Sequence, residues 1–357
     1  MITFAQLKQQ PELLTPEVRS PIFHLDGMMT ILWEGDPGAE GVMYQGEWME
    51  QPAPLEQIPG TNIWGIDAPA PPLPRTVCSY IGVGNDSGPR PSPRHQRDIF
   101  GPDLPPLPIA EGEPSTLAEE IVLPAPGLAG GERRVRILLP PGYQAGQPYH
   151  TLYSTDGQMA LDQGQWFPAV LDSLRHRGEA PLVILVAMDN HPTERPAEYL
   201  IDGSRNLAAR AWVWETVVPY VEARYPARRR WAVGGSNGAS MALQVMLGRP
   251  DLFSGGAFYS PWHGNGSSTM AILRMANTWP GGGRIAISHG TFGLGERKNL
   301  PRARPLAVHL QVRGAAVHFL KLEGYGHNFA AWHRAMPLLL GWLFEPFFFL
   351  RTGGEPF

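Results

Sequence analysis

The sequence has almost no cysteine: Cys78 is the only one among 357 residues. A single cysteine excludes a disulfide framework within the chain and is typical of a reducing compartment. Cys78 alternates with Thr76 and Tyr80 in an apolar run, which predicts a buried structural thiol. The sequence also has no HExxH motif and no Cys/His cluster with metal-ligand spacing. We therefore expect neither a metal centre nor a bound cofactor.

An excess of basic residues is missing as well, since 29 Lys and Arg stand against 33 Asp and Glu, a net charge of −4. Neither a nucleic-acid partner nor an anionic membrane surface is expected. The short cluster Arg228, Arg229 and Arg230 precedes a strand and predicts a solvated turn. No run of about 18 apolar residues is long enough to span a membrane, and residues 1–10 lack a signal-peptide pattern. We expect a cytoplasmic protein without a membrane partner.

Proline, in contrast, is abundant, with 38 residues spread unevenly along the chain. Residues 88–113 contain a dense group of them and predict a stiff, extended connector. This connector divides the chain into an N-terminal domain, residues 1–110, and a second domain, residues 114–357. In the first domain, short β-like segments lie between turn residues at 29–33, 41–45, 62–66 and 75–81. Their spacing favours a small β-sandwich.

After the connector, buried strands alternate with helices of 10 to 20 residues. The strands are expected at residues 135–139, 151–154, 182–188, 231–233, 256–259, 285–288 and 317–322. The helices are expected at residues 159–177, 205–224, 239–247, 270–277, 300–313 and 329–344. This alternation predicts an α/β domain with a mostly parallel sheet and helices on both faces.

The strongest single motif is Gly-Gly-Ser-Asn-Gly at residues 234–238, between a β-like run and a helix-forming stretch. A nucleophile elbow requires this order, because its serine sits on a sharp turn that projects Oγ from the sheet. Gly234 and Gly238 remove Cβ atoms where strand and helix nearly touch. The sequence therefore predicts a serine hydrolase with Ser236 as nucleophile.

A serine nucleophile needs a base, and that base needs an acid. His327 follows the last predicted strand and two glycines, Gly324 and Gly326, so we expect it to be the base. Glu296 is the only carboxylate in the loop after the preceding strand and takes the role of acid by elimination. Two alternatives stay open for this role: Glu296 is an exposed residue at a helix start, or a Ser–His dyad works without a strong acid.

The oxyanion of an acyl transfer needs two N–H donors. The first is expected at Asn237, directly after the nucleophile. The second is expected at Gln158, because Gly157 lets the chain turn after the strand at residues 151–154.

Several motifs together resemble the enterochelin (ferric enterobactin) esterase family, in the esterase-D-like branch of the α/β-hydrolases. They are Asp-Gly-Gln at 156–158, Asp-Asn at 189–190 followed by Arg195, Glu198 and Tyr199, the elbow, and Gly-x-Gly-His-Asn-Phe at 324–329. Residues 30–33 and 59–64 are similar to the immunoglobulin-like, early-set domain that precedes the hydrolase in this family. The loop from Gly290 to Glu296 is longer than the family's short Gly-x-x-Glu, a departure that concerns the role of Glu296.

The resemblance implies hydrolysis of the ester bonds of a catecholate siderophore through an acyl-serine, with release of iron. Arg195 and Arg205 are candidates for contact with an anionic catecholate complex, whereas Arg195 alternatively pairs with Glu198 as part of the structure. Residues 260–263 (Ser-Pro-Trp-His) replace a serine-rich stretch of the family. We therefore expect substrate contacts at Trp262 that differ from those of the family.

Two other functions remain open. One is a general acyl, feruloyl or acetyl esterase that acts on carbohydrate or other small-molecule esters. The other is a protein that binds a siderophore or sugar without turnover. Residues 347–350 (Phe-Phe-Phe-Leu) either pack on the domain or form a homodimer contact.

Overall fold

The computed structural model describes residues 2–35, 39–71, 76–83, 98–100, 111–162 and 166–344. Most of the predicted connector, the segment at 347–350 and the side chain of Cys78 lie outside this description. The chain divides into two compact units. The first comprises Met1–Pro105, Gly290–Arg297 and Glu323–Ala331, and the second comprises Pro106–His289, Lys298–Leu322 and Trp332–Phe357. Each unit is described by itself below.

The first unit contains two four-stranded sheets, with strand orders β1-β2-β6-β5 and β4-β3-β7-β8. The strands are β1 (Ile22–Phe23), β2 (Met28–Glu34), β3 (Val42–Gly46), β4 (Ala53–Pro54), β5 (Glu56–Gln57), β6 (Ile63–Pro69), β7 (Thr76–Val83) and β8 (Asp98–Phe100). Alternate residues of β3 are buried, which is the period of a strand with one face on the core. Met29, Ile31, Trp33, Val42 and Tyr44 contribute to that core. The prediction of a small N-terminal β domain is confirmed.

A short helix, α1 (Phe4–Gln9), and a 3₁₀ turn, η1 (Pro11–Leu13), precede these strands. Thr3 caps α1 through its hydroxyl, and the Gln6 side chain returns a hydrogen bond to the Thr3 N–H. Phe4 and Leu7 pack into a second apolar cluster with Leu32 and Ile63.

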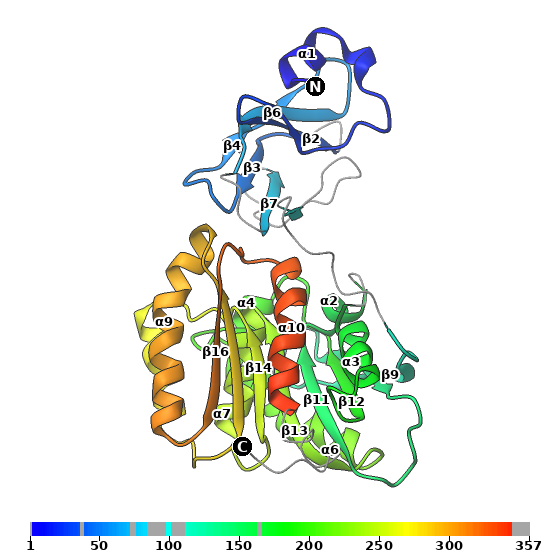
Figure 1. The fold of residues 1–357 in the computed structure, drawn as a ribbon, viewed down its shortest axis with the longest axis vertical. Helices are drawn as coiled ribbons and strands as arrows, with labels where there is room; N and C mark the ends of the chain where they lie inside the picture. The colour runs from blue at the N-terminus through cyan, green and yellow to red at the C-terminus, as the bar shows by residue number, and fades with distance from the viewer. Residues whose placement is uncertain are drawn as a thin grey trace. The chain divides into compact units, whose positions relative to one another are not determined.

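The second unit is built on an eight-stranded sheet in the order β16-β15-β14-β13-β11-β12-β10-β9 (Figure 1). The strands are β9 (Thr116–Pro124), β10 (Glu132–Leu139), β11 (Tyr149–Thr155), β12 (Val183–Met188), β13 (Ala227–Gly235), β14 (Gly255–Tyr259), β15 (Arg284–Gly290) and β16 (Ala316–Leu322). β12, β11, β13, β14 and β15 run parallel to their neighbours in this series, whereas β9 and β10 are antiparallel. A mostly parallel sheet is confirmed, and the edge strand β9 was not predicted.

Ten helical segments connect these strands or follow them in the described residues. They are α2 (Gly157–Asp162), α3 (Trp166–His176), α4 (Arg195–Tyr199), α5 (Asn206–Trp212), the π-type segment η2 (Val213–Val217), α6 (Val218–Glu222), α7 (Asn237–Gly248), α8 (Gly266–Ala276), α9 (Gly293–Val312) and α10 (Phe329–Phe344). α10 lies in front of the sheet in the view of Figure 1, whereas apolar residues of α7 join the main core with those of β13 and α5. None of the helices in the described ranges is long and apolar enough to cross a membrane.

One helix boundary affects the site. A helix was predicted from residue 300, but α9 begins at Gly293. Glu296 therefore lies in the first helical turn and not in a loop. The early start follows from Gly293, whose φ of +81° lets the chain turn into the helix.

Candidate active site

Ser236 lies at a sharp turn between β13 and α7, where the strand ends at Gly235 and the helix begins at Asn237. Its backbone has φ +55° and ψ −126°, a conformation that a residue with a Cβ rarely adopts. Such backbone strain costs about 1–3 kcal/mol and persists only where surrounding contacts enforce it. Here the Ser236 N–H donates to the Tyr259 carbonyl at 2.9 Å, which ties the turn to the end of β14.

The glycines of the motif are required by close packing. A Cβ on Gly234 would lie 2.6 Å from the carbonyl carbon of Gly238, so strand and helix could not approach. A Cβ on Gly238 would lie 2.7 Å from Thr155 Oγ1 and would collide with the Asp156 carboxylate. Thr155 Oγ1 donates to the Gly238 carbonyl at 2.9 Å. The start of α7 is therefore packed against the end of β11.

The segment after β11 forms a second unusual turn. Asp156 has a φ of +56°, and α2 begins at the next residue, Gly157. A Cβ on Gly157 would lie 2.7 Å from the Ala187 carbonyl carbon, so only glycine fits beside β12. Gln158 is the second residue of α2, and Asn237 is the first residue of α7. N–H groups in the first turn of a helix have no acceptor within that helix, which suits both for an oxyanion.

Glu296 and His327 form a hydrogen-bonded pair in the first unit. His327 Nδ1 lies 3.0 Å from Glu296 Oε1. Glu296 is fully buried, so the exposed glutamate considered as an alternative is not what the structure has. A carboxylate at this position favours the tautomer with a proton on Nδ1. With the proton on Nδ1, Nε2 is the basic nitrogen of the ring, and a histidine held by a buried carboxylate is the base-and-acid pair that a serine nucleophile needs.

Two segments distant in sequence hold this pair. The Phe292 N–H donates to the Tyr325 carbonyl at 3.0 Å, and the Gly324 N–H donates to Thr291 Oγ1 at 2.9 Å. These bonds join the segment that carries Glu296 to the segment that carries His327. The orientation of the pair is therefore set by backbone contacts as well as by the side-chain hydrogen bond.

Glu47, which follows β3, adds a third segment to the pair. Its Oε1 accepts from the His327 backbone N–H at 2.7 Å, and its backbone carbonyl accepts from the Leu294 N–H at 3.0 Å. Sequence reasoning missed Glu47, because 280 residues separate it from His327 and no local motif marks it.

The two arginines that are candidates for substrate contact both have carboxylate partners. Arg195 makes a two-pronged pair with Asp156, and Arg205 donates to Glu194 at 2.8 Å. The considered pair of Arg195 with Glu198 is wrong, because Glu198 is buried against Arg133 of β10.

Trp262 lies beside the elbow. Its backbone N–H approaches the Ser236 carbonyl at 3.4 Å, and its carbonyl accepts from Ser240 Oγ. The Trp262 side chain is half-buried. Among the described residues, no group of three His, Cys, Asp or Glu side chains is arranged to hold a metal ion.

Comparison with known protein families shows which family the chain belongs to. Residues 127–343 match the family described as "Putative esterase". The chain belongs to this esterase family. The match spans more than half of the chain and includes both Ser236 and His327. It confirms the predicted class, a carboxylic-ester hydrolase.

Solved structures share the fold of this esterase. The enterobactin esterase Fes from Shigella flexneri, in a structure determined in the presence of enterobactin, is 20% identical with a TM-score of 0.63, over 90% of this chain and 93% of that chain. The ferric enterobactin esterase from Salmonella typhimurium is 19% identical with a TM-score of 0.60, over 91% and 96% of the two chains. These likenesses confirm the predicted α/β-hydrolase fold.

The esterase also resembles a curated protein, the uncharacterized protein YjcH of Bacillus subtilis (strain 168). The two are 25% identical over 135 residues, which are 37% of this chain and 56% of the relative. The matched part therefore spans about half the length of that relative.

Proposed function

We propose that this esterase is a serine hydrolase that cleaves the ester bonds of a catecholate, enterobactin-like siderophore through an acyl-serine intermediate. The observation that carries the serine mechanism is the backbone of Ser236, with φ +55° and ψ −126° between β13 and α7. A strained turn at this point of an α/β sheet is costly, and its use is to project a nucleophile. The pair of Glu296 and His327 supplies a suitable acid and base.

The reaction proceeds in two halves. His327 Nε2 takes the Ser236 proton as Oγ bonds to the ester carbonyl carbon, and the N–H groups of Asn237 and Gln158 hold the oxyanion. Each such donor contributes about 3 kcal/mol to the transition state. The imidazolium then protonates the alcohol oxygen as the ester C–O bond breaks, which leaves an acyl-serine. Water, deprotonated by His327, attacks the acyl group, and Ser236 leaves with the proton.

The substrate class is supported by the similar structures. Two are esterases of enterobactin or its ferric complex by name, and one was determined in the presence of enterobactin. Their identities to this chain are 20% and 19%, so the substrate is proposed on fold and on the matching motifs together. Hydrolysis of a trilactone of this kind would release iron from its chelator.

A second candidate function is favoured by the pairing of the two candidate arginines. Arg195 and Arg205 are both paired with carboxylates, so neither offers an unpaired positive charge to an anionic complex. A general esterase for neutral acyl or carbohydrate esters does not need one. The two candidates share the serine mechanism and differ in substrate charge.

The test compares purified wild type with Ser236→Ala by chromatography. Substrates are ferric enterobactin, iron-free enterobactin, p-nitrophenyl butyrate and a feruloyl sugar ester. We expect Ser236-dependent release of linear dihydroxybenzoyl-serine products, with loss of at least about 10⁴-fold in the variant. Turnover of only p-nitrophenyl butyrate and the feruloyl sugar ester would rule out the siderophore as substrate and support the general esterase.

A fluorophosphonate probe completes the test, since it forms a covalent bond with an activated serine. Labelling of wild type but not of Ser236→Ala is expected. A folded wild-type protein that resists the probe and turns over none of the esters would instead be a binding protein without catalysis.

A further inference from the structure

The turn that precedes Gln158 carries a buried carboxylate that accepts hydrogen bonds from three donor atoms. Asp156 is only 6% exposed and has a φ of +56°. Its Oδ1 accepts from Arg195 Nε at 2.8 Å and from Asn190 Nδ2, and its Oδ2 accepts from Arg195 Nη2. Two side chains, Arg195 and Asn190, thus hold the carboxylate of this turn residue.

Arg195 is built into this position. Its guanidinium lies over the Tyr199 ring, 5.5 Å from the centroid, and its side chain is 20% exposed. Burial opposes the charge, but the Asp156 carboxylate outweighs burial and raises the pKa of Arg195. A planar fork that matches a carboxylate with two donors specifies geometry as well as charge.

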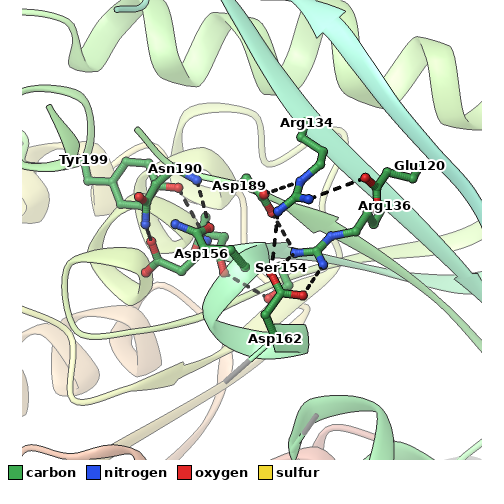
Figure 2. A network of polar contacts seen from close by, with 11 residues as sticks. Glu120, Arg134, Arg136, Ser154, Asp156, Asp162, Asp189, Asn190 and Tyr199 are labelled. Carbon is green, nitrogen blue, oxygen red and sulfur yellow. Dashed lines mark hydrogen bonds and ion pairs between the residues drawn. The ribbon is translucent and has the colours of Figure 1, made fainter. Parts of the chain in front are cut away.

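Asn190 connects the same carboxylate to Gln158. Its side chain donates to Asp156, and its backbone N–H donates to Gln158 Oε1 at 3.1 Å. The first turn of α2 is therefore held from the residues that follow β12. Figure 2 shows Asn190 and Tyr199 beside Asp156 at one end of this network.

The other end of the network holds the last turn of α2. Asp189, adjacent to Asn190, accepts from Arg134 Nε at 2.7 Å and from Arg136 Nη2 at 3.1 Å. Arg136 also donates to Asp162, the last residue of α2 (Figure 2). The first turn of α2 is thus held through Asn190, which follows β12, and its last residue is held by the charged side chain of Arg136 on β10.

From this geometry we infer that Arg195 and Asn190 are positioning residues for the oxyanion site. They hold Asp156 in its left-handed turn, and this turn places the Gln158 N–H where the oxyanion forms. Arg195 thus acts on every ester alike, whatever the charge of the substrate. The inference rests on the proposed function, in which Gln158 is an oxyanion donor.

The test measures Arg195→Ala and Arg195→Lys with the neutral p-nitrophenyl butyrate and with ferric enterobactin, an anionic complex. We expect kcat to fall by about 100-fold for Arg195→Ala, the effect of losing an oxyanion donor, with KM nearly unchanged. The loss should be equal for every ester that the wild type turns over. Arg195→Lys keeps the charge without the fork and should lose less.

Arg249→Ala is the matched control, because Arg249 makes the same two-pronged pair with Asp251 at an exposed site, with distances of 2.8 and 2.7 Å. It should leave kcat and KM unchanged. The rate of fluorophosphonate labelling of Ser236 should fall in Arg195→Ala as kcat does, since the phosphoryl oxygen accepts from the same Asn237 and Gln158 N–H groups. A melting curve separates this loss from unfolding, and Arg195→Lys provides the comparison where the alanine variant is unfolded.

The outcomes separate this inference from the proposed function. If wild type shows no Ser236-dependent turnover or labelling, the serine mechanism itself fails. If wild type is active but Arg195→Ala raises only KM, and only for the anionic ester, then Arg195 recognises substrate and the positioning role is wrong. Unchanged kinetics and labelling in both Arg195 variants would also overturn it.

Discussion

The segment that carries Ser236 and the segments that carry Glu296 and His327 are held in different ways. Around Ser236, backbone contacts set the conformation of the turn. β13 and α7 touch at Gly234 and Gly238, and the Ser236 N–H donates a hydrogen bond to the end of β14. Around His327, side chains are needed in addition to backbone bonds, since one hydrogen bond joins the imidazole to Glu296 and another joins the His327 backbone N–H to the Glu47 carboxylate. The motif for the Ser236 turn occupies five consecutive residues, whereas the Glu296–His327 pair depends on three segments that are distant in sequence.

This difference predicts how each region responds to substitution. Close backbone packing tolerates no added atom, so a small enlargement should disturb structure and activity together. A side chain that makes a hydrogen bond can be replaced by one of the same shape and different chemistry, so isosteric changes near His327 should reduce activity while the fold remains. The following variants test these expectations, from the largest expected effect to the smallest.

Glu296→Gln should give the largest effect, with kcat about 10³- to 10⁴-fold lower. The amide keeps the volume of the fully buried glutamate but cannot stabilise the imidazolium, and it can present an N–H to His327 Nδ1 and select the wrong tautomer. Ester hydrolysis and thermal unfolding measured together check this. A variant that loses less than about tenfold would assign His327 to a dyad that works without the acid.

Gly238→Ala should reduce activity by at least about 100-fold and also lower stability by about 1–3 kcal/mol, the usual cost of overpacking. Its Cβ would lie 2.7 Å from Thr155 Oγ1 and would collide with the Asp156 carboxylate. Denaturant unfolding and kcat should therefore change together, unlike in Glu296→Gln. Gly266→Ala is the matched control, because a Cβ there meets nothing within 4 Å.

The sequence predicted the features that depend on neighbouring residues. The elbow motif, the parallel strands and the bounds of α10 all follow from local pattern, because strand burial, helix periodicity and the steric demands of a tight turn are local. For Arg195, the sequence left two interpretations open, contact with an anionic substrate or a structural pair with the nearby Glu198. That pairing is wrong because Arg133, 65 residues away, occupies Glu198.

The contacts that could not be predicted from the sequence join residues that are far apart along the chain. Asp156 and Arg195 are 39 residues apart, and Glu47 and His327 are 280 residues apart. Such pairs are decided by the order of strands in a sheet and by how segments pack, and no periodicity in either segment records the partner. Glu296 shows a smaller version of the problem, since the sequence left open whether it is exposed, and only the structure shows it fully buried in the first turn of α9.

Glu47→Ala should lower kcat by about tenfold, because the His327 backbone N–H loses its acceptor at 2.7 Å and the histidine segment loses one of its ties. Glu47→Gln keeps an amide oxygen that can accept the same hydrogen bond, and it should restore most of the rate. Steady-state kinetics of both variants at several pH values measure this. Equal losses in both variants would mean that the charge of Glu47, and not its hydrogen bond, supports the histidine.

Thr155→Val should have the smallest effect, a rate loss of about two- to fivefold and a loss of about 1 kcal/mol in stability. Valine keeps the shape of threonine but removes the hydroxyl that donates to the Gly238 carbonyl at 2.9 Å. The glycine contacts that enforce the elbow remain, so most of the geometry of Ser236 should persist. Kinetics and denaturant unfolding of this variant measure both losses. If Thr155→Val cost as much as Gly238→Ala, a single side-chain hydrogen bond would hold the elbow, and the contrast between the two regions would disappear.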